Sequence, residues 1–199
     1  YGERARGRDL AAARGTCDVR IYSAAVVDPS FDARFSALGR SYAYRVSDRP
    51  EPLGRWDRLW VEEALDEAAM NEAGAALLGE HDFLGFCRPR EGATTIRTLR
   101  TLLAERDAEG TLVFRVEADA FCHSMVRSLV GALLLVGSGA RDVTYPVQIL
   151  RARSRSEAAP IAPAHGLTLE GVEYPDPSQW SARAEQARAR RDTCCGDDG

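Results

Sequence analysis

Residues 123–137 constrain the fold most, because they form the most apolar helix candidate in the chain. The apolar run 129–136 lies within them, and Gly137, Ser138 and Gly139 follow as a natural helix stop. A helix that is apolar on most of its surface must be buried against other elements. The run is too short to cross a bilayer, and nothing near Tyr1 has the residue order of a signal peptide. We therefore expect a soluble, cytoplasmic protein with no membrane partner, built around this helix.

Strand-like alternation surrounds the helix candidate. Tyr42, Tyr44 and Val46 alternate with smaller or polar residues in a strand over 35–46, and a hairpin is predicted over 96–106 and 112–117. Further strands are expected over 18–27 and 167–174, and helices over 64–77 and 146–153. Because strands and helices alternate without a regular βαβ rhythm, the pattern predicts an α+β fold with a mixed, mostly antiparallel sheet flanked by helices.

The length of 199 residues suggests one large domain or two small ones. We expect residues 1–17 to be an irregular edge, 18–175 to form the domain, and 176–199 to be a polar tail or frayed helix. Five cysteines lack the paired spacing of a disulfide framework, so we expect reduced thiols. Their scatter also argues against a metal site.

The charge balance does not exclude a nucleic-acid ligand. The formal net charge is -4, and all 26 basic residues are arginines. Phosphate recognition requires only a local positive face. The distribution of the arginines therefore matters more than their number.

The first candidate site is the strand that carries Tyr42, with Arg34 and Arg40 ahead of it. An aromatic ring can stack on a base while guanidinium groups hold phosphates. The alternative is an ordinary edge strand with core tyrosines and solvated arginines.

The second candidate is the start of the apolar helix, where His123 and Arg127 share one helical face. An arginine in an apolar helix is costly unless it is paired or faces a polar cleft. Arg127 is thus either the partner of an anion or carboxylate, or a surface residue ahead of the buried section.

The third candidate is a local excess of positive charge formed by Arg88, Arg90, Arg97 and Arg100. Such loops can bind a phosphate backbone, although most charge runs are simply solvated.

Four ordered motifs resemble one known family. FDARFSALGRSYAYRV begins at Phe31, and GEHDFLGFC, ADAFCHSMVRSLVGALLLVGSG and APAHGLTLEGVEYP follow in order. Together they resemble the tRNA pseudouridine synthases that modify the anticodon stem and loop, over about residues 18–175. The resemblance implies the pseudouridine synthase fold, tRNA as substrate, no metal or organic cofactor, and a homodimer.

In that family an aspartate attacks the uridine, the glycosidic bond breaks, and the base is rotated and rejoined through carbon. The resemblance implies that Tyr42 stacks on the flipped uracil. It also implies that Arg127 pairs with the catalytic aspartate. The residue patterns described above make Arg34, Arg40, Arg88, Arg90, Arg97 and His123 the candidate substrate-binding residues.

The family's RTDAGVHA-like aspartate motif is absent from this sequence. Asp28, Asp32 and Asp119 do not match it. The expectation is therefore a synthase domain truncated at its N-terminus and inactive alone, and the alternative is a noncatalytic RNA-binding module. A small-molecule α/β enzyme is disfavoured, because adjacent Cys122 and His123 would point to different faces of a helix.

Overall fold

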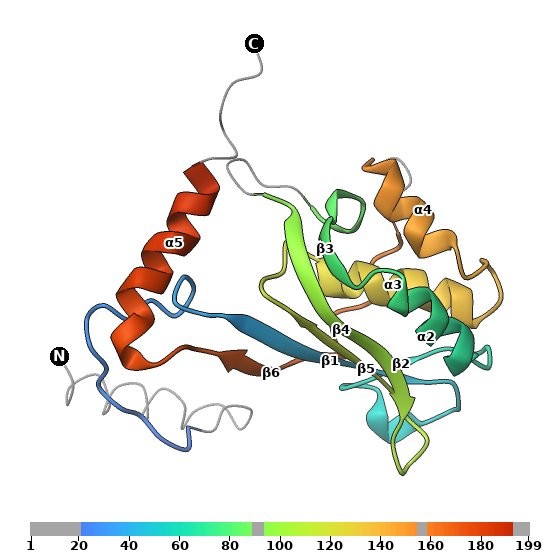
Figure 1. The fold of residues 1–199 in the computed structure, drawn as a ribbon. Coiled ribbons are helices and arrows are strands. Elements are labelled where there is room, and N and C mark those ends of the chain that lie inside the picture. The colour runs from blue at the N-terminus through green and yellow to red at the C-terminus, as the bar shows by residue number, and fades with distance from the viewer. Residues whose placement is uncertain (1–20, 89–93, 155–158, 193–199) are drawn as a thin grey trace.

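The computed structural model describes residues 21–88, 94–154 and 159–192, with the side chains of 189–192 excepted. Its centre is a sheet in the order β2-β1-β5-β4-β3, with β6 also paired to β1 (Figure 1). The strands are β1 (Gly39–Ser47), β2 (Leu59–Trp60), β3 (Gly79–Asp82), β4 (Ile96–Arg106), β5 (Leu112–Ala118) and β6 (Leu167–Glu173). All pairs are antiparallel except β1 with β2. The fold is therefore α+β with a mixed, mostly antiparallel sheet flanked by helices, as the sequence predicts.

Three helices pack together beside the sheet, and a fourth stands apart from them (Figure 1). The three are α2 (Glu67–Ala75), α3 (Met125–Gly137) and α4 (Tyr145–Ala152). The fourth, α5 (Trp180–Asp192), lies beside the start of β1, away from the other three. Three short 3-10 turns, η1 (Pro52–Gly54), η2 (Leu84–Phe86) and η3 (Pro177–Gln179), complete the described elements. No helix in the described ranges is long and apolar enough to cross a membrane.

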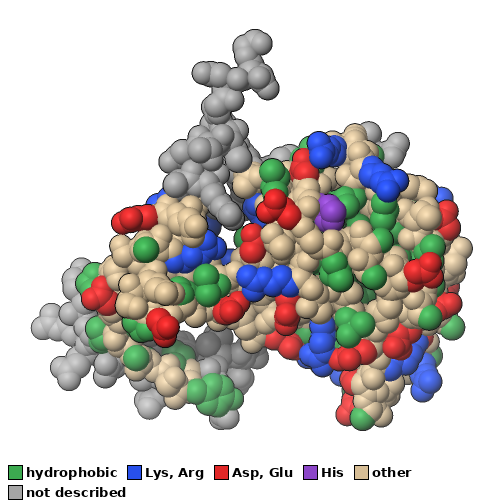
Figure 2. Space-filling view, in the orientation of Figure 1, with side chains coloured by type: hydrophobic (Ala, Val, Ile, Leu, Met, Phe, Trp, Pro, Cys, Tyr) green, Lys and Arg blue, Asp and Glu red, His purple; other side chains and the backbone are tan. Residues whose placement is uncertain are grey.

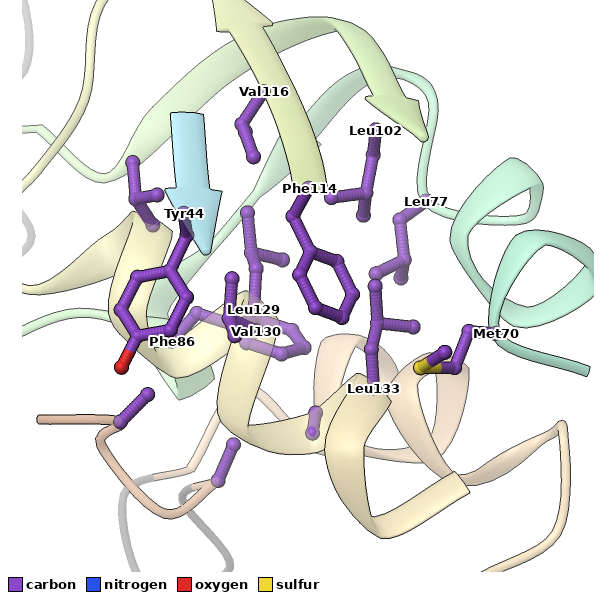
Figure 3. Close-up of a cluster of buried hydrophobic side chains, with 14 of the residues drawn as sticks. Tyr44, Met70, Leu77, Phe86, Leu102, Phe114, Val116, Leu129, Val130 and Leu133 are labelled. Carbon is purple, nitrogen blue, oxygen red and sulfur yellow. The ribbon is translucent and has the colours of Figure 1, made fainter. Parts of the chain in front are cut away.

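The core lies between the sheet and α3, as expected for the most apolar segment. Tyr44, Phe114 and Leu102 point from the strands toward Leu129 and Leu133 of α3 (Figure 3). Tyr42, Tyr44 and Val46 lie on one face of β1. Tyr44 and Val46 are fully buried, and Tyr42, nearer the start of the strand, is half-buried. Burying large apolar side chains contributes roughly 1.5–3 kcal/mol each. The core thus fixes the register of β1 and the position of Tyr42.

Most element predictions are confirmed, and one is wrong. The β4–β5 hairpin and the helices α2, α3 and α4 occur where the sequence predicts them, within a few residues. The strand expected over 18–27 is absent from its described part, 21–27, where Ile21, Tyr22, Val26 and Val27 are exposed. Apolar alternation there has no partner strand to pair with among the described residues. The expected tail or frayed helix after residue 175 includes α5, whose Ala184 is buried.

Candidate nucleic-acid interface

A pocket of about 480 Å³ lies between the start of β1, the segment leading into α3, and α5. We call it the arginine pocket, because five arginines line it. They are Arg34, Arg40, Arg88, Arg97 and Arg183. Figure 2 shows basic side chains gathered in the hollow beside α5. This volume lies within the range typical of small-ligand sites, and the charge favours an anion.

Tyr42 supplies an aromatic surface in this pocket. Its ring meets Phe121 edge to face, with the ring centroids 5.2 Å apart. Tyr42 comes from β1 and Phe121 from the segment after β5, two strands that pair in antiparallel register. Both rings line the arginine pocket, so a planar ligand has an aromatic surface next to guanidinium groups.

Backbone contacts hold two of the arginines. The guanidinium group of Arg40 donates to the carbonyl oxygens of Arg34 at 2.7 Å and Asp119 at 3.2 Å. Arg97 donates to the carbonyl oxygen of Thr94 at 2.8 Å. The two acceptors of Arg40 are neutral, so they orient its guanidinium group without cancelling its charge. Among the described residues of the pocket, five arginines face one carboxylate, that of Asp119.

Arg88 and His123 lie side by side at the edge of the pocket. The Arg88 amide donates to the carbonyl oxygen of His123 at 2.9 Å, and both side chains are exposed. The structure pairs the sulfur atoms of their neighbours Cys87 and Cys122 as a disulfide, with Cα atoms 5.7 Å apart, whereas the sequence predicts reduced thiols. The other three cysteines lie outside the described residues.

Arg127 does not line the arginine pocket. Its Nε donates to the carbonyl oxygen of Ala162, whose amide donates to the carbonyl oxygen of Arg127 at 3.1 Å. Within the described part of the chain, its two terminal nitrogens have no hydrogen-bond partner. Burial raises the pKa of neighbouring Tyr44 to about 12, and the positive charge of Arg127 opposes that rise. The hydroxyl of Tyr44 donates to the carbonyl oxygen of Pro163 at 2.8 Å.

The carboxylates of Asp28, Asp32 and Asp119 all accept hydrogen bonds from backbone amides. The Asp119 carboxylate accepts from the amides of Thr98 at 2.9 Å and Ala120 at 2.8 Å. Asp32 accepts from two amides and from Arg188, and the hydrogen bond from the Phe35 amide is the main cause of its lowered pKa. A hydrogen bond with Ser30 lowers the pKa of Asp28. Asp119 is the one carboxylate among the described residues of the pocket.

The structure thus brings Arg34, Arg40, Tyr42, Arg88, Arg97 and His123 into one pocket. Arg90 lies outside the described residues, and Arg100 pairs with Glu173 at 2.9 Å away from this pocket. Sequence reasoning missed Arg183, although Trp180, Arg183, Ala184 and Ala187 have the spacing of one helical face. No group of three potential metal-ligating side chains is found within the described ranges.

An α+β fold with an arginine-lined, aromatic pocket defines a candidate RNA-binding protein. Comparison with known proteins makes the class specific: the family described as tRNA pseudouridine synthase matches residues 73–175, more than half of the chain. The chain belongs to the tRNA pseudouridine synthase family.

Curated relatives named tRNA pseudouridine synthase A agree with this assignment. The relative from Streptomyces griseus is 52% identical over 181 residues, which cover 89% of this chain and 64% of the relative. The relative from Frankia casuarinae is 54% identical over 176 residues, covering 87% and 64%. The relative from Cutibacterium acnes is 49% identical over 193 residues, covering 92% and 69%. The chain therefore spans just under two thirds of the length of the first two.

Proposed function

We propose that this chain supplies the tRNA-binding and base-stacking side of a tRNA pseudouridine synthase active site. The reaction is the isomerisation of uridine to pseudouridine in the anticodon stem and loop. The observation that carries the proposal is the arginine pocket, in which the Tyr42–Phe121 pair adjoins five arginines. A flipped base needs an aromatic surface, and its flanking phosphates need positive charge.

In this proposal Tyr42 stacks on the target uracil. Its ring is half-buried and already held by Phe121, so little side-chain freedom is lost when a base binds. Arg34, Arg40, Arg88 and Arg97 bind phosphates on either side of the flipped nucleotide, and His123 lies at the same edge. The chemistry requires no metal or organic cofactor, and the protein acts in the cytoplasm as a homodimer.

In this proposal Arg127 holds the attacking carboxylate. Arg127 lies outside the arginine pocket, beside Tyr44, which is two residues along β1 from Tyr42. Its Nε is oriented by Ala162, which leaves two terminal nitrogens to donate to a carboxylate. A paired arginine keeps such a carboxylate ionised and therefore nucleophilic. Asp119 is poorly suited to that role, because its carboxylate already accepts two backbone hydrogen bonds.

The second candidate function is RNA binding without catalysis. The one carboxylate of the described pocket is bound to backbone amides, which favours this reading for the isolated chain. In both readings the chain binds tRNA, with an affinity that falls as salt concentration rises.

The test has two measurements on the 199-residue chain. Binding of unmodified tRNA across a salt series tests the RNA site, and affinity that ignores salt would count against both readings. Pseudouridine formation in the same tRNA separates them. We expect none from this chain, and turnover would show that it contains the attacking carboxylate.

A further inference from the structure

We propose that the C-terminal helix α5 is a second wall of the RNA site, on which Arg183 binds a phosphate of the bound strand. This inference rests on the proposed RNA-binding function and adds a subsite to it. The family match ends at residue 175, before α5 begins at Trp180.

The inner face of α5 is fixed against the segment that precedes β1. The Ser36 hydroxyl donates to the carbonyl oxygen of Trp180 at 3.2 Å, and the Trp180 and Phe31 ring centroids are 4.7 Å apart. Ala184, one turn further, is only 3% exposed. Arg183 shares this face, so the fold holds it in place.

Arg188 braces the same wall but has a different role. It pairs with Asp32 at 2.9 Å, and its guanidinium carbon lies 5.0 Å from the ring centroid of Phe35, which lines the arginine pocket. A carboxylate thus already compensates its charge. Arg188 ties α5 to the wall formed by Phe35 and leaves ligand binding to Arg183.

Arg183 has no such compensation. Its Nε donates to the carbonyl oxygen of Ala37 and its NH1 to the side-chain oxygen of Gln186, both at 3.3 Å, and both acceptors are neutral. It forms no ion pair with any described residue. It is half-buried and lines a pocket with four other arginines, where the charges repel one another. An anion bound between them offsets that repulsion.

The pocket indicates which kind of anion binds. Its walls hold the Tyr42–Phe121 aromatic pair as well as arginines, a combination that fits a phosphate attached to a stacking base. A free inorganic phosphate would make no use of the rings. Arg183 therefore binds the phosphodiester backbone next to the base that Tyr42 stacks on.

The test compares variants of the whole chain for binding to an unmodified anticodon stem-loop RNA across a salt series. We expect Arg183→Ala to weaken binding about fivefold and to reduce the salt slope by about one. Arg183→Gln should match it, while Arg183→Lys should stay close to the wild type because it keeps the charge.

Arg141→Ala is the matched control. Arg141 is exposed in the α3–α4 connection, over the ring of Tyr145, and does not line the arginine pocket. The same loss of charge there should change the affinity less than twofold. Thermal unfolding of each variant checks that α5 still packs, and the Lys and Gln variants keep the comparison valid if Arg183→Ala unfolds.

The outcomes separate the two proposals. If the wild-type chain binds no RNA, the proposed function fails. If it binds RNA, but Arg183→Ala and Arg183→Gln match Arg141→Ala in affinity and salt slope, only the α5 subsite is overturned. Equal competition by inorganic phosphate and by the RNA would also overturn it, because the site would then recognise a free anion.

Discussion

Tyr42 meets Phe121 edge to face with ring centroids 5.2 Å apart, and both rings line the arginine pocket. The hydroxyl of Tyr42 forms no hydrogen bond within the described part of the chain. The ring itself is therefore the functional feature that the structure presents at this position.

Replacing the ring should weaken RNA binding. We expect Tyr42→Ala to lower the affinity for a uridine-containing single-stranded RNA about tenfold, since stacking on an aromatic residue contributes about 1–3 kcal/mol per base. Tyr42→Phe should bind like the wild type. Fluorescence anisotropy on a labelled oligonucleotide measures both variants.

The control for this prediction is Trp56→Ala. Trp56 is 76% exposed and does not line the arginine pocket, so its loss should leave the affinity unchanged. Equal losses for Tyr42→Ala and Trp56→Ala would contradict a stacking role for Tyr42.

Asp48 and Arg106 form the least exposed carboxylate–guanidinium pair of the described ion pairs. Asp48 is 7% exposed, receives two hydrogen bonds from Arg106 at 2.6 and 3.1 Å, and also accepts from the Leu65 amide. The hydrogen bond from Arg106 is the main cause that lowers the pKa of Asp48 from 3.8. A depressed folded-state pKa stabilises the fold above the unfolded-state pKa, and this contribution is lost as pH falls through the folded-state pKa.

Asp48→Asn should therefore lower the free energy of unfolding by about 2 kcal/mol at pH 7. The difference from the wild type should begin to shrink below about pH 4, where the carboxyl of the unfolded chain takes up a proton, and should be lost as pH falls through the lowered folded-state pKa of Asp48. Urea unfolding at both pH values measures it. Asp142→Asn is the control. The Asp142 carboxylate is exposed and accepts from the Thr144 amide, a role that asparagine can keep, so the free energy of unfolding should change little. A pH-independent difference would rule out the charge as its cause.

Local patterns predicted the elements whose signals are contiguous in the sequence. The β4–β5 hairpin has alternation on both sides of a turn at Asp107 to Gly110, and α3 has an apolar run with a glycine stop. The strands β2 and β3 were missed because they span two and four residues. Such short strands form through pairing with distant partners, which no local period encodes.

The candidate site was predicted only in part, because local sequence signals mark some of its residues and not others. Tyr42, Arg88 and His123 belong to motifs with an aromatic or basic signal of their own, and the fold brings them into one pocket. Arg183 belongs to a polar helix whose position depends on the contact between Trp180 and the distant Phe31. The variants above test the roles of Tyr42 and Arg183, and those of Arg88 and His123 stay predictions.

Gly131 of α3 faces residues 160–162, and the carbonyl oxygen of Ala162 orients Arg127. A Cβ at Gly131 would overlap the carbonyl oxygen of Pro160 and lie 3.5 Å from the Ala162 amide. Glycine to alanine in a helix normally gains about 1 kcal/mol. Here the overlap is with backbone, which cannot rotate away, so Gly131→Ala should destabilise the fold by about 1–3 kcal/mol.

Gly137→Ala is the comparison for Gly131→Ala, and thermal unfolding measures the stability of both variants. A Cβ at Gly137 would meet the sulfur of Met70 at 2.6 Å, and a methionine side chain can change rotamer. We expect a smaller loss than for Gly131→Ala. The reverse order would show that the 159–162 loop moves more easily than the core.

The disulfide between Cys87 and Cys122 joins residues 35 apart in the sequence. Closing a loop of this length in the unfolded chain corresponds to about 3–4 kcal/mol of stability in the chain-entropy account. The double variant Cys87→Ser and Cys122→Ser should therefore unfold at a lower urea concentration than the wild type, and a thiol reductant should lower the wild-type midpoint toward that of the variant. Cys194→Ser is the control and should keep the wild-type response to reductant. Alkylation in denaturant without reductant should leave Cys87 and Cys122 unlabelled, and labelling of both would show that the purified chain carries them as thiols.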